Sequence, residues 1–155
     1  MIHVRRAGVL DTGPMAELLN EIIAQGGTTA MTRMVKRGDL AQWMQFHAGR
    51  NAWFVAEAAN GVLLGFQWIE PKDTLPAEAC DISTFTQIGR TRLDTGTALF
   101  EATRNAAKDL GYTWINATIR AENEGGLAYY QSRSFETYHL PGADPHRITK
   151  RYNLR

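Results

Sequence analysis

The chain has 155 residues and a mass of 17.3 kDa, with 44% hydrophobic and 21% charged residues. This length and composition predict one globular domain over residues 1–155 and exclude a disordered chain. Lys and Arg number 17 against 16 Asp and Glu, a net charge of +1, so nucleic-acid binding is not expected. Cys80 is the single cysteine, which excludes an intrachain disulfide framework or a thiolate zinc cluster.

Targeting and metal signals are absent from the sequence. No apolar run of signal-peptide length opens the chain, and no segment approaches the ~20 apolar residues of a membrane-spanning helix. We therefore expect a cytoplasmic protein that does not bind membranes. The 4 histidines show no metal-ligand spacing, so no metal site is expected.

The hydrophobic pattern predicts elements in the order β-α-α-β-β-β-α-β-α-β-β. The expected strands are 2–6, 53–57, 62–69, 81–88, 114–119, 135–138 and 147–152, and the expected helices are 12–25, 39–46, 94–110 and 124–132. This order places one strand–helix–strand unit among mostly antiparallel strands. It predicts an α/β layered domain.

Turn and cap residues mark several of these boundaries. Asp11 or Thr12 is expected to cap the first helix, and Asp39 is expected to cap the second. Asn60-Gly61 lies between two apolar strands and is the strongest short hairpin signal in the chain.

A candidate anion site follows the fourth expected strand. The loop carries Arg90 and Arg92, and Asp94 or Thr95 then opens a helix. A helix N-terminus offers free N–H groups and a partial positive charge to a phosphate, and Gly96 lets the backbone approach it closely. Ordinary capping explains the same pattern, and a solvated loop explains the two arginines.

Two polar side chains follow the next strand. Asn123 lies just past the strand end, and Tyr130 follows seven residues later, about two helical turns along. Both side chains can therefore point into one cleft between two strands. Asn123 is also a plausible helix cap, and Tyr130, beside Tyr129, is also a plausible core aromatic.

In these segments the chain resembles the Gcn5-related N-acetyltransferase (GNAT) superfamily, and within it the phosphinothricin-acetyltransferase-like group. The resemblance rests on residues 20–29, 81–86, 92–99 and 123–135. It implies a mixed, mostly antiparallel sheet that is splayed between its fourth and fifth strands, with helices on both faces. It also implies that acetyl-CoA lies in the splayed gap as co-substrate.

The resemblance further implies a set of cofactor contacts. The backbone of Phe85, Thr86 and Gln87 would pair with the pantetheine arm, and Asn123 matches an asparagine that contacts the cofactor. The pyrophosphate would be held by backbone N–H groups of Arg92, Leu93, Asp94, Thr95, Gly96 and Thr97. This chain departs from the family at Asp94 and at Ser134, where the family has glycine.

The implied reaction is acetyl transfer to the primary amine of a small molecule, an amino acid or an amino-acid-like antimetabolite. Asp81 stands where the group has a glutamate and is the implied base or anchor of a water relay. Tyr130 is the implied acid toward the leaving thiolate. For Asp81 the alternative is a turn former at the strand end. Relatives in the group are often homodimers, so a homodimer is expected.

Two other functions fit the same residues. Asp94 and Ser134 motivate an acyl-CoA-binding or regulatory domain that has lost activity. Acetylation of a protein or peptide N-terminus would require an open acceptor groove. Trp43 or Trp68 is a candidate to line an acceptor pocket, although core packing explains the tryptophans as simply.

Overall fold

The computed structural model describes residues 1–29, 31–87 and 93–154. Its elements follow the predicted order, with one short 3-10 helix, η1 (Val9–Asp11), added before the first α-helix. The strands are β1 (Ile2–Arg6), β2 (Ala52–Ala58), β3 (Leu63–Glu70), β4 (Ala79–Thr86), β5 (Trp114–Arg120), β6 (Glu136–Tyr138) and β7 (Arg147–Asn153). The helices are α1 (Thr12–Gln25), α2 (Arg37–Gln45), α3 (Leu93–Asp109) and α4 (Glu124–Ser132). None of the described helices is both long and apolar enough to cross a membrane.

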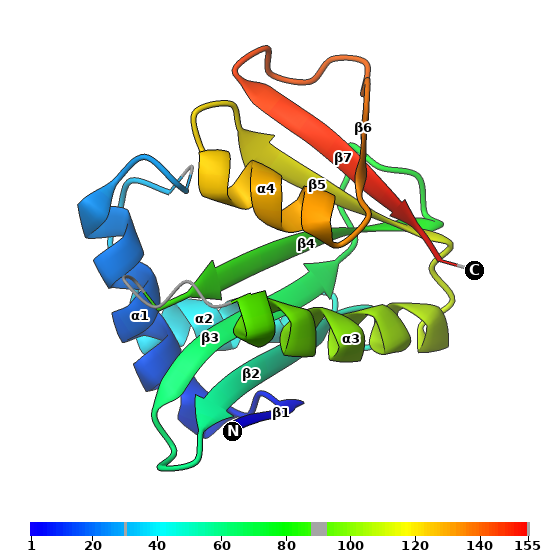
Figure 1. The fold of residues 1–155 in the computed structure, drawn as a ribbon. Helices are drawn as coiled ribbons and strands as arrows, with labels where there is room; N and C mark the ends of the chain where they lie inside the picture. The colour runs from blue at the N-terminus through cyan, green and yellow to red at the C-terminus, as the bar shows by residue number, and fades with distance from the viewer. Residues whose placement is uncertain (30, 88–92, 155) are drawn as a thin grey trace.

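The strands form one sheet in the order β1-β2-β3-β4-β5-β7-β6. All neighbours pair antiparallel except β4 and β5, which run parallel. The β4–β5 register covers only Ala79 to Asp81 on β4, opposite Trp114 to Asn116 on β5. Both strands continue beyond these pairs and diverge, as Figure 1 shows. The predicted splay between the fourth and fifth strands is therefore confirmed.

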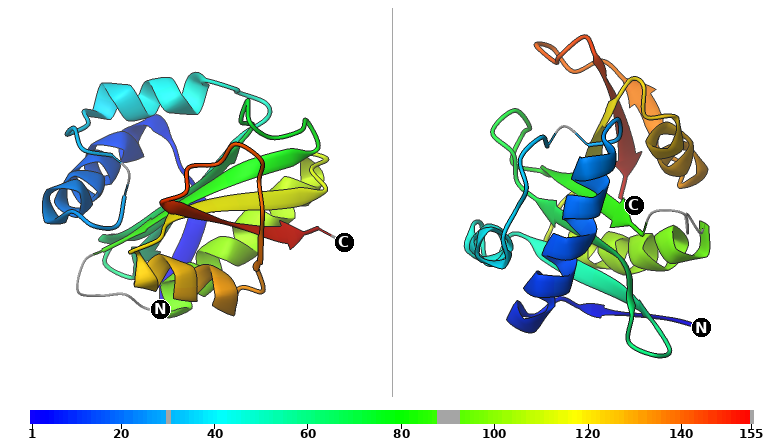
Figure 2. Two further views of the ribbon diagram at one scale, coloured as in Figure 1. Left: turned by 90° about the horizontal axis from the view of Figure 1, so that it is seen from above. Right: turned by 90° about the vertical axis from the view of Figure 1, so that its left-hand side faces the viewer.

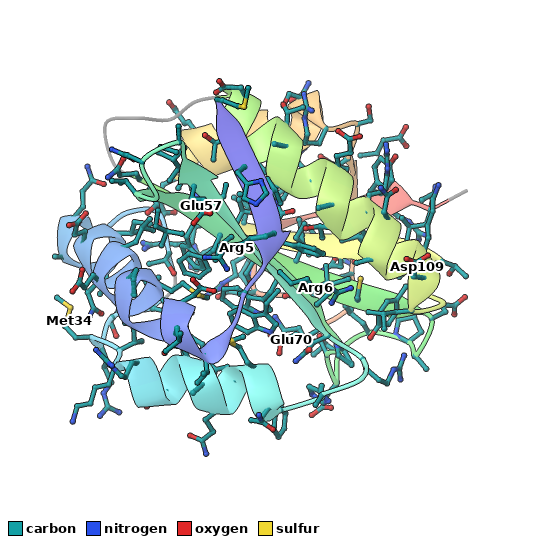
Figure 3. All side chains as sticks on the ribbon, turned by 90° about the horizontal axis from the view of Figure 1, so that it is seen from below. Arg5, Arg6, Met34, Glu57, Glu70 and Asp109 are labelled. Carbon is teal, nitrogen blue, oxygen red and sulfur yellow. The ribbon has the colours of Figure 1, made fainter. Side chains whose placement is uncertain are left out.

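Helices cover both faces of the sheet, and each face has its own core. Helices α1 and α2 lie on one face, and α3 lies on the other (Figures 2 and 3). On the first face Met15 and Leu40 pack against Trp68, whereas on the second Leu99 packs with Ile82. Tyr130 of α4 belongs to the second core. We refer to these as the α1/α2 face and the α3/α4 face.

Strand alternation gives β4 two different sides. The β3–β4 register sets Glu70 opposite Asp81, Trp68 opposite Ser83 and Phe66 opposite Phe85, and these side chains lie on the α1/α2 face. The intervening pairs face α3 and α4; they are Ile69 with Ile82 and Gln67 with Thr84. The strand that borders the splay thus presents one set of side chains to each layer.

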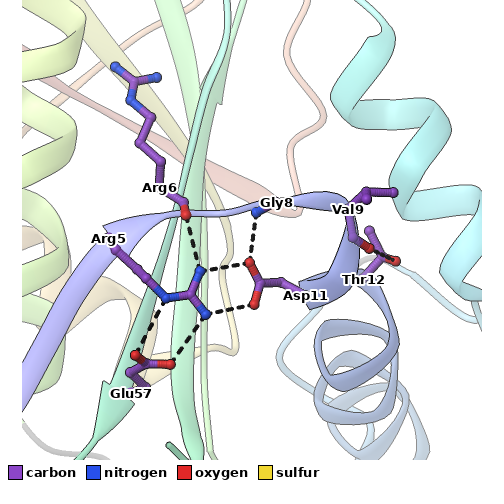
Figure 4. A network of polar contacts seen from close by, with 7 residues as sticks. All are labelled: Arg5, Arg6, Gly8, Val9, Asp11, Thr12 and Glu57. Atoms are coloured by element: carbon purple, nitrogen blue, oxygen red, sulfur yellow. Dashed lines mark hydrogen bonds and ion pairs between the residues drawn. The ribbon is translucent and has the colours of Figure 1, made fainter.

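Arg5 ties β1 to the start of α1 (Figure 4). Its guanidinium donates to both carboxylate oxygens of Asp11, at 2.9 and 2.8 Å, and to those of Glu57 on β2, at 3.4 and 3.3 Å. These hydrogen bonds lower the pKa of Asp11 and raise that of Arg5. Asp11 occupies the cap position of α1, but its side chain makes no cap hydrogen bond. The predicted capping role is wrong because Arg5 and the Gly8 amide bind the carboxylate instead.

The start of α2 also differs from the prediction. The helix begins at Arg37, and Lys36 occupies the cap position. Asp39 is the third residue of the helix, and its carboxylate accepts the Lys36 amide at 2.8 Å. An acidic side chain inside the first turn also stabilises a helix start. The predicted helix therefore begins at Asp39, two residues after the observed start at Arg37.

Candidate active site

A cleft of about 680 Å³ fills the splay between β4 and β5. Side chains and backbone from β4, β5, α4 and the loop after α1 line it. It brings together half of the predicted site residues: Asp81, Phe85, Thr86, Gly96, Asn123 and Tyr130. Asp94, Thr95 and Thr97 lie in the first turns of α3 but do not line this cleft, and Arg92, like Arg90, falls outside the described residues.

The backbone of β4 offers only alternate residues to the cleft. The Gln87 amide donates to the Leu64 carbonyl on β3 at 2.9 Å. Because hydrogen-bonding directions alternate along a strand, the Phe85 backbone also points toward β3. A side chain at Gly65 would lie 2.8 Å from the Phe85 carbonyl oxygen, which agrees with that direction. The predicted cofactor pairing of the Phe85 and Gln87 backbone conflicts with this orientation, whereas the backbone of Thr86, and of Thr84 before it, faces the gap.

The N-terminus of α3 is packed under an aromatic ring. A Cβ at Gly96 would lie 2.4 Å from Cε1 of Tyr129, and the Tyr129 hydroxyl donates to the Gly96 carbonyl at 2.8 Å. Glycine is therefore required here by a ring of the protein itself, in addition to any ligand. Asp94 is exposed, and its Oδ1 accepts the Thr95 amide at 3.1 Å. The carboxylate thus occupies one of the amides that the resemblance assigned to a phosphate.

Tyr130 sits at the inner end of the cleft on the α3/α4 face. It is 7% exposed, and its hydroxyl lies 2.8 Å from Thr84 Oγ1. Gln67 Nε2 donates to Thr84 Oγ1 at 2.8 Å and to the Tyr129 hydroxyl at 3.1 Å. The buried Gln67 amide therefore holds the hydroxyls of Thr84 and Tyr129 in position. Burial raises the pKa of Tyr130, and it raises that of Tyr129 to about 12. Tyr130 is therefore a neutral phenol whose hydroxyl lies within hydrogen-bond distance of Thr84 at the cleft.

Asp81 lies at the point where β4 and β5 separate, on the α1/α2 face. The residue is 8% exposed, and its carboxylate accepts a hydrogen bond from Asn116 Nδ2 at 2.9 Å and lies 3.5 Å from Lys72 Nζ. Burial raises the pKa of Asp81, while Lys72 and the Asn116 hydrogen bond oppose that rise. Asp81 is the third residue of β4, so the alternative of a turn former at a strand end is wrong.

The loop after α1 is tied across the cleft to β5 and α4. Asn123 caps α4 by accepting the Gly126 amide at 2.9 Å, and its Nδ2 donates to the Thr28 carbonyl at 3.1 Å. Arg120 Nη1 donates to the Thr29 carbonyl at 2.9 Å. The predicted capping role of Asn123 is confirmed, and the same side chain lines the cleft.

The turn that follows α4, at Ser134, has the conformation that a glycine would adopt. Ser134 has a φ of +71°, the left-handed region in which glycine is favoured. The Phe135 amide donates to the Tyr130 carbonyl at 3.0 Å, and Phe135 is buried against Tyr130. The departure at Ser134 therefore leaves the position of Tyr130 intact.

Several residues of the site carry no signal in the sequence. Thr84, Gln67, Lys72 and Asn116 are ordinary strand or loop residues until the register of β3, β4 and β5 is known. Strand alternation alone could have placed Asp81 and Thr84 on opposite faces of β4, because they are three residues apart.

No protein-family model matches the chain, and no curated protein sequence matches it. Solved structures share its fold. A GNAT superfamily phosphinothricin acetyltransferase from Sinorhizobium meliloti, in complex with AcCoA, is 16% identical with a TM-score of 0.85 over 99% of this chain and 88% of its own. An N-acetyltransferase from Staphylococcus aureus Mu50 is 19% identical with a TM-score of 0.85 over 100% of this chain and 99% of its own.

A third structure widens the range of named substrates. A ribosomal-protein-alanine N-acetyltransferase from Brucella melitensis is 17% identical, with a TM-score of 0.84 over 98% of this chain and 99% of its own. The chain therefore has the fold of the Gcn5-related N-acetyltransferases, as the sequence resemblance predicted. Two of these proteins are named for different acceptors, so an acceptor has to be argued from this chain's own residues.

Proposed function

We propose that the protein is an acetyl-CoA-dependent N-acetyltransferase that acts on the primary amine of a small molecule, such as an amino acid or an amino-acid-like compound. One observation carries the proposal. A protonated phenol, Tyr130, and a buried carboxyl group, Asp81, line one cleft from opposite faces of β4. Acid and base are thus separated by the strand along which a thioester would lie.

The residues present fit acetyl-CoA. The edge of β4 turns the Thr84 and Thr86 backbone toward the gap, and the N-terminus of α3 lies beside it with Gly96 lining the cleft. The cofactor supplies a thioester carbonyl that is open to attack by an amine. The Thr86 amide is the candidate donor to the carbonyl oxygen, because a backbone N–H in a sheltered cleft stabilises developing negative charge.

Proton movement can be assigned to the two side chains. An amine attacks only in its neutral form, so Asp81 would take a proton from the incoming ammonium, directly or through one water. Lys72 and Asn116 hold the carboxylate in place for that role. Tyr130, a neutral phenol hydrogen-bonded with Thr84, would donate to the leaving thiolate and recover its proton through Thr84 or solvent.

The alternative of an acyl-CoA-binding domain without activity receives no support from the turn at Ser134, which keeps its glycine-like conformation. Asp94 remains the one departure near the expected pyrophosphate. It is exposed to solvent, which weakens its repulsion of an anion.

Two measurements test the proposal in sequence. Thermal unfolding with saturating acetyl-CoA, against CoA and no ligand, should show a rise of a few degrees in the midpoint, since ~100 times Kd adds ~2.7 kcal/mol. Thiol release from acetyl-CoA is then followed across amino acids, amino-acid analogues, simple amines and a peptide N-terminus. Absence of both the shift and any amine-dependent thiol release would refute the proposal.

A further inference from the structure

A second hollow opens on the α1/α2 face, next to the cleft. It measures about 400 Å³ and is lined by Met31, Gln42, Trp43, Phe46, Trp68 and Glu70. Met31 also lines the cleft, so the two spaces share a wall. Figure 3 labels Glu70 on the sheet beside α2.

The walls of this hollow are aromatic and held in position. Trp43 of α2 and Trp68 of β3 face each other with ring centroids 6.2 Å apart. Trp68 is stacked on Trp53 at 4.1 Å with the rings nearly parallel, so it cannot easily rotate. Phe46 also lines the hollow; it is 64% exposed, and its ring packs edge-on against His47. Aromatic faces of this kind attract cations and apolar stems.

Glu70 places a negative charge in this aromatic setting. The Trp68 indole Nε1 donates to its Oε2 at 3.0 Å, which fixes the carboxylate. Among the described residues, no Lys, Arg or His forms an ion pair with Glu70. A neutral group covering it would bury an unpaired charge, and an anionic group would add repulsion. The hollow is therefore complementary to a cation on an apolar stem.

The hollow also lies where the far end of an acceptor would reach. Glu70 is directly opposite Asp81 in the β3–β4 register, a spacing of ~5 Å between Cβ atoms. Lys72 forms its ion pair with Asp81, and among the described residues no ion pair reaches Glu70. An amine that gives its proton to Asp81 would thus extend its other end toward Glu70.

We infer that the acceptor is a basic amine: a short alkyl chain that carries, besides the amine to be acetylated, a second cationic group bound between Trp43, Trp68 and Glu70. This inference rests on the proposed function and narrows its substrate class. It predicts discrimination by charge at the distal end of the substrate, independent of the chemistry at the thioester.

A matched pair of amines tests this directly. 1,5-Diaminopentane and n-hexylamine have the same number of heavy atoms and differ in one terminal ammonium. We expect kcat/KM to be about tenfold or more higher for the diamine, and glutamate to be the poorest acceptor. Glu70→Gln, which keeps an acceptor for Trp68, should bring the two amines within about twofold by lowering only the diamine value. Glu101→Gln, an exposed charge on α3, is the control and should change neither.

Three kinetic results would overturn the inference. They are equal use of the two amines by the wild type, a preference that survives in Glu70→Gln, and preferred use of glutamate. Each would leave acetyl transfer itself standing. If instead no amine releases thiol, a binding measurement still tests whether the hollow holds a cation. Diaminopentane should then quench tryptophan fluorescence saturably in the wild type and not in Glu70→Gln, and absence of that difference would reject the inference.

Discussion

On the α3/α4 face of β4 the cleft is lined mainly by backbone and hydroxyl groups, whereas on the α1/α2 face charged and aromatic side chains line it. The first face contains the Thr84–Tyr130 pair and the start of α3. The second contains Asp81 with Lys72 and continues into the aromatic hollow. A binding surface made of backbone groups keeps its hydrogen-bonding groups when the sequence changes. A binding surface made of side chains changes the ligand that it fits when those side chains are substituted.

Three solved acetyltransferases share this fold at 16% to 19% identity with the chain. The part that would hold a common cofactor depends on strand direction and helix position, which many sequences can provide. The part that would select an amine depends on a few side chains such as Glu70 and Trp43. We therefore expect substitutions in the aromatic hollow of the second face to change which amine is used, and substitutions of Tyr130 or Asp81 to change the rate.

The largest expected effect is at Tyr130. Tyr130→Phe removes the candidate acid and should lower kcat by about 10² or more, while the acetyl-CoA-induced thermal shift remains. Tyr152→Phe is the matched control, because it removes a hydroxyl from the same aromatic cluster and should leave kcat within about twofold. A Tyr130→Phe enzyme with wild-type kcat would show that the phenol is only a packing residue.

The next largest effect on activity is expected at Asp81, on the α1/α2 face. Asp81→Asn keeps the shape of the side chain but cannot accept a proton, so kcat/KM should fall about 10- to 100-fold. The wild-type rate should rise with pH as the carboxyl group ionises, and this rise should disappear in the variant. Asp73→Asn, at an exposed position of the same loop as Lys72, is the control. A variant that retains the acidic limb would exclude Asp81 as its source.

Asp81 also makes a stability prediction with a definite sign. Burial raises its pKa in the folded state, so the folded protein binds this proton more tightly than the unfolded chain does. The associated stabilisation is present below the unfolded pKa of ~3.9 and is lost as pH rises through the raised folded value. Asp81→Asn should therefore gain in relative stability from acidic to neutral pH. Denaturant unfolding at several pH values would measure this, and the opposite trend would contradict the raised pKa.

A smaller effect is expected at the start of α3. Asp94→Asn keeps an acceptor for the Thr95 amide but removes the charge, and should tighten acetyl-CoA binding about threefold to fivefold. The gain should shrink in high salt, which screens exposed charges. Calorimetry at two ionic strengths would measure it, with Glu101→Gln as a control farther along the helix. Unchanged affinity at low salt would place the carboxylate away from the bound phosphate.

The smallest effect concerns the turn that positions Tyr130. Ser134→Gly relieves a left-handed conformation and should stabilise the fold by about 0.5–1 kcal/mol. Ser132→Gly, within α4, should destabilise it by a similar amount. Denaturant unfolding of the two variants would separate the effects, and a destabilising Ser134→Gly would show that the serine side chain has a structural role of its own.

The sequence was informative wherever a signal is local. Helical spacing and turn residues placed the elements, and the seven-residue interval from Asn123 to Tyr130 brought both side chains to one cleft. Contacts between distant segments were not predictable. The Gln67 amide meets Tyr129 across 62 residues, and Glu70 lines the same hollow as Trp43 only because Trp43 of α2 lies beside Trp68 of β3.

The corrected predictions have the same origin. The family resemblance implies cofactor pairing for the backbone of Phe85, Thr86 and Gln87 alike, because it does not distinguish the two edges of the strand. The register with β3 assigns alternate amides to the sheet and the others to the gap. Asp11 likewise reads as a helix cap until β1 brings Arg5 beside it.

The short β4–β5 pairing has a consequence for backbone protection. Beyond Asp81, amides along β4 alternate between the hydrogen-bonded edge with β3 and the open edge of the gap. Hydrogen exchange should therefore follow a period of two residues within one strand, slow at Phe85 and Gln87 and fast at Thr84 and Thr86. A ligand that lies along β4 as an added strand would slow only the second set. The loss of this alternation would then report, residue by residue, how far the ligand extends along the strand.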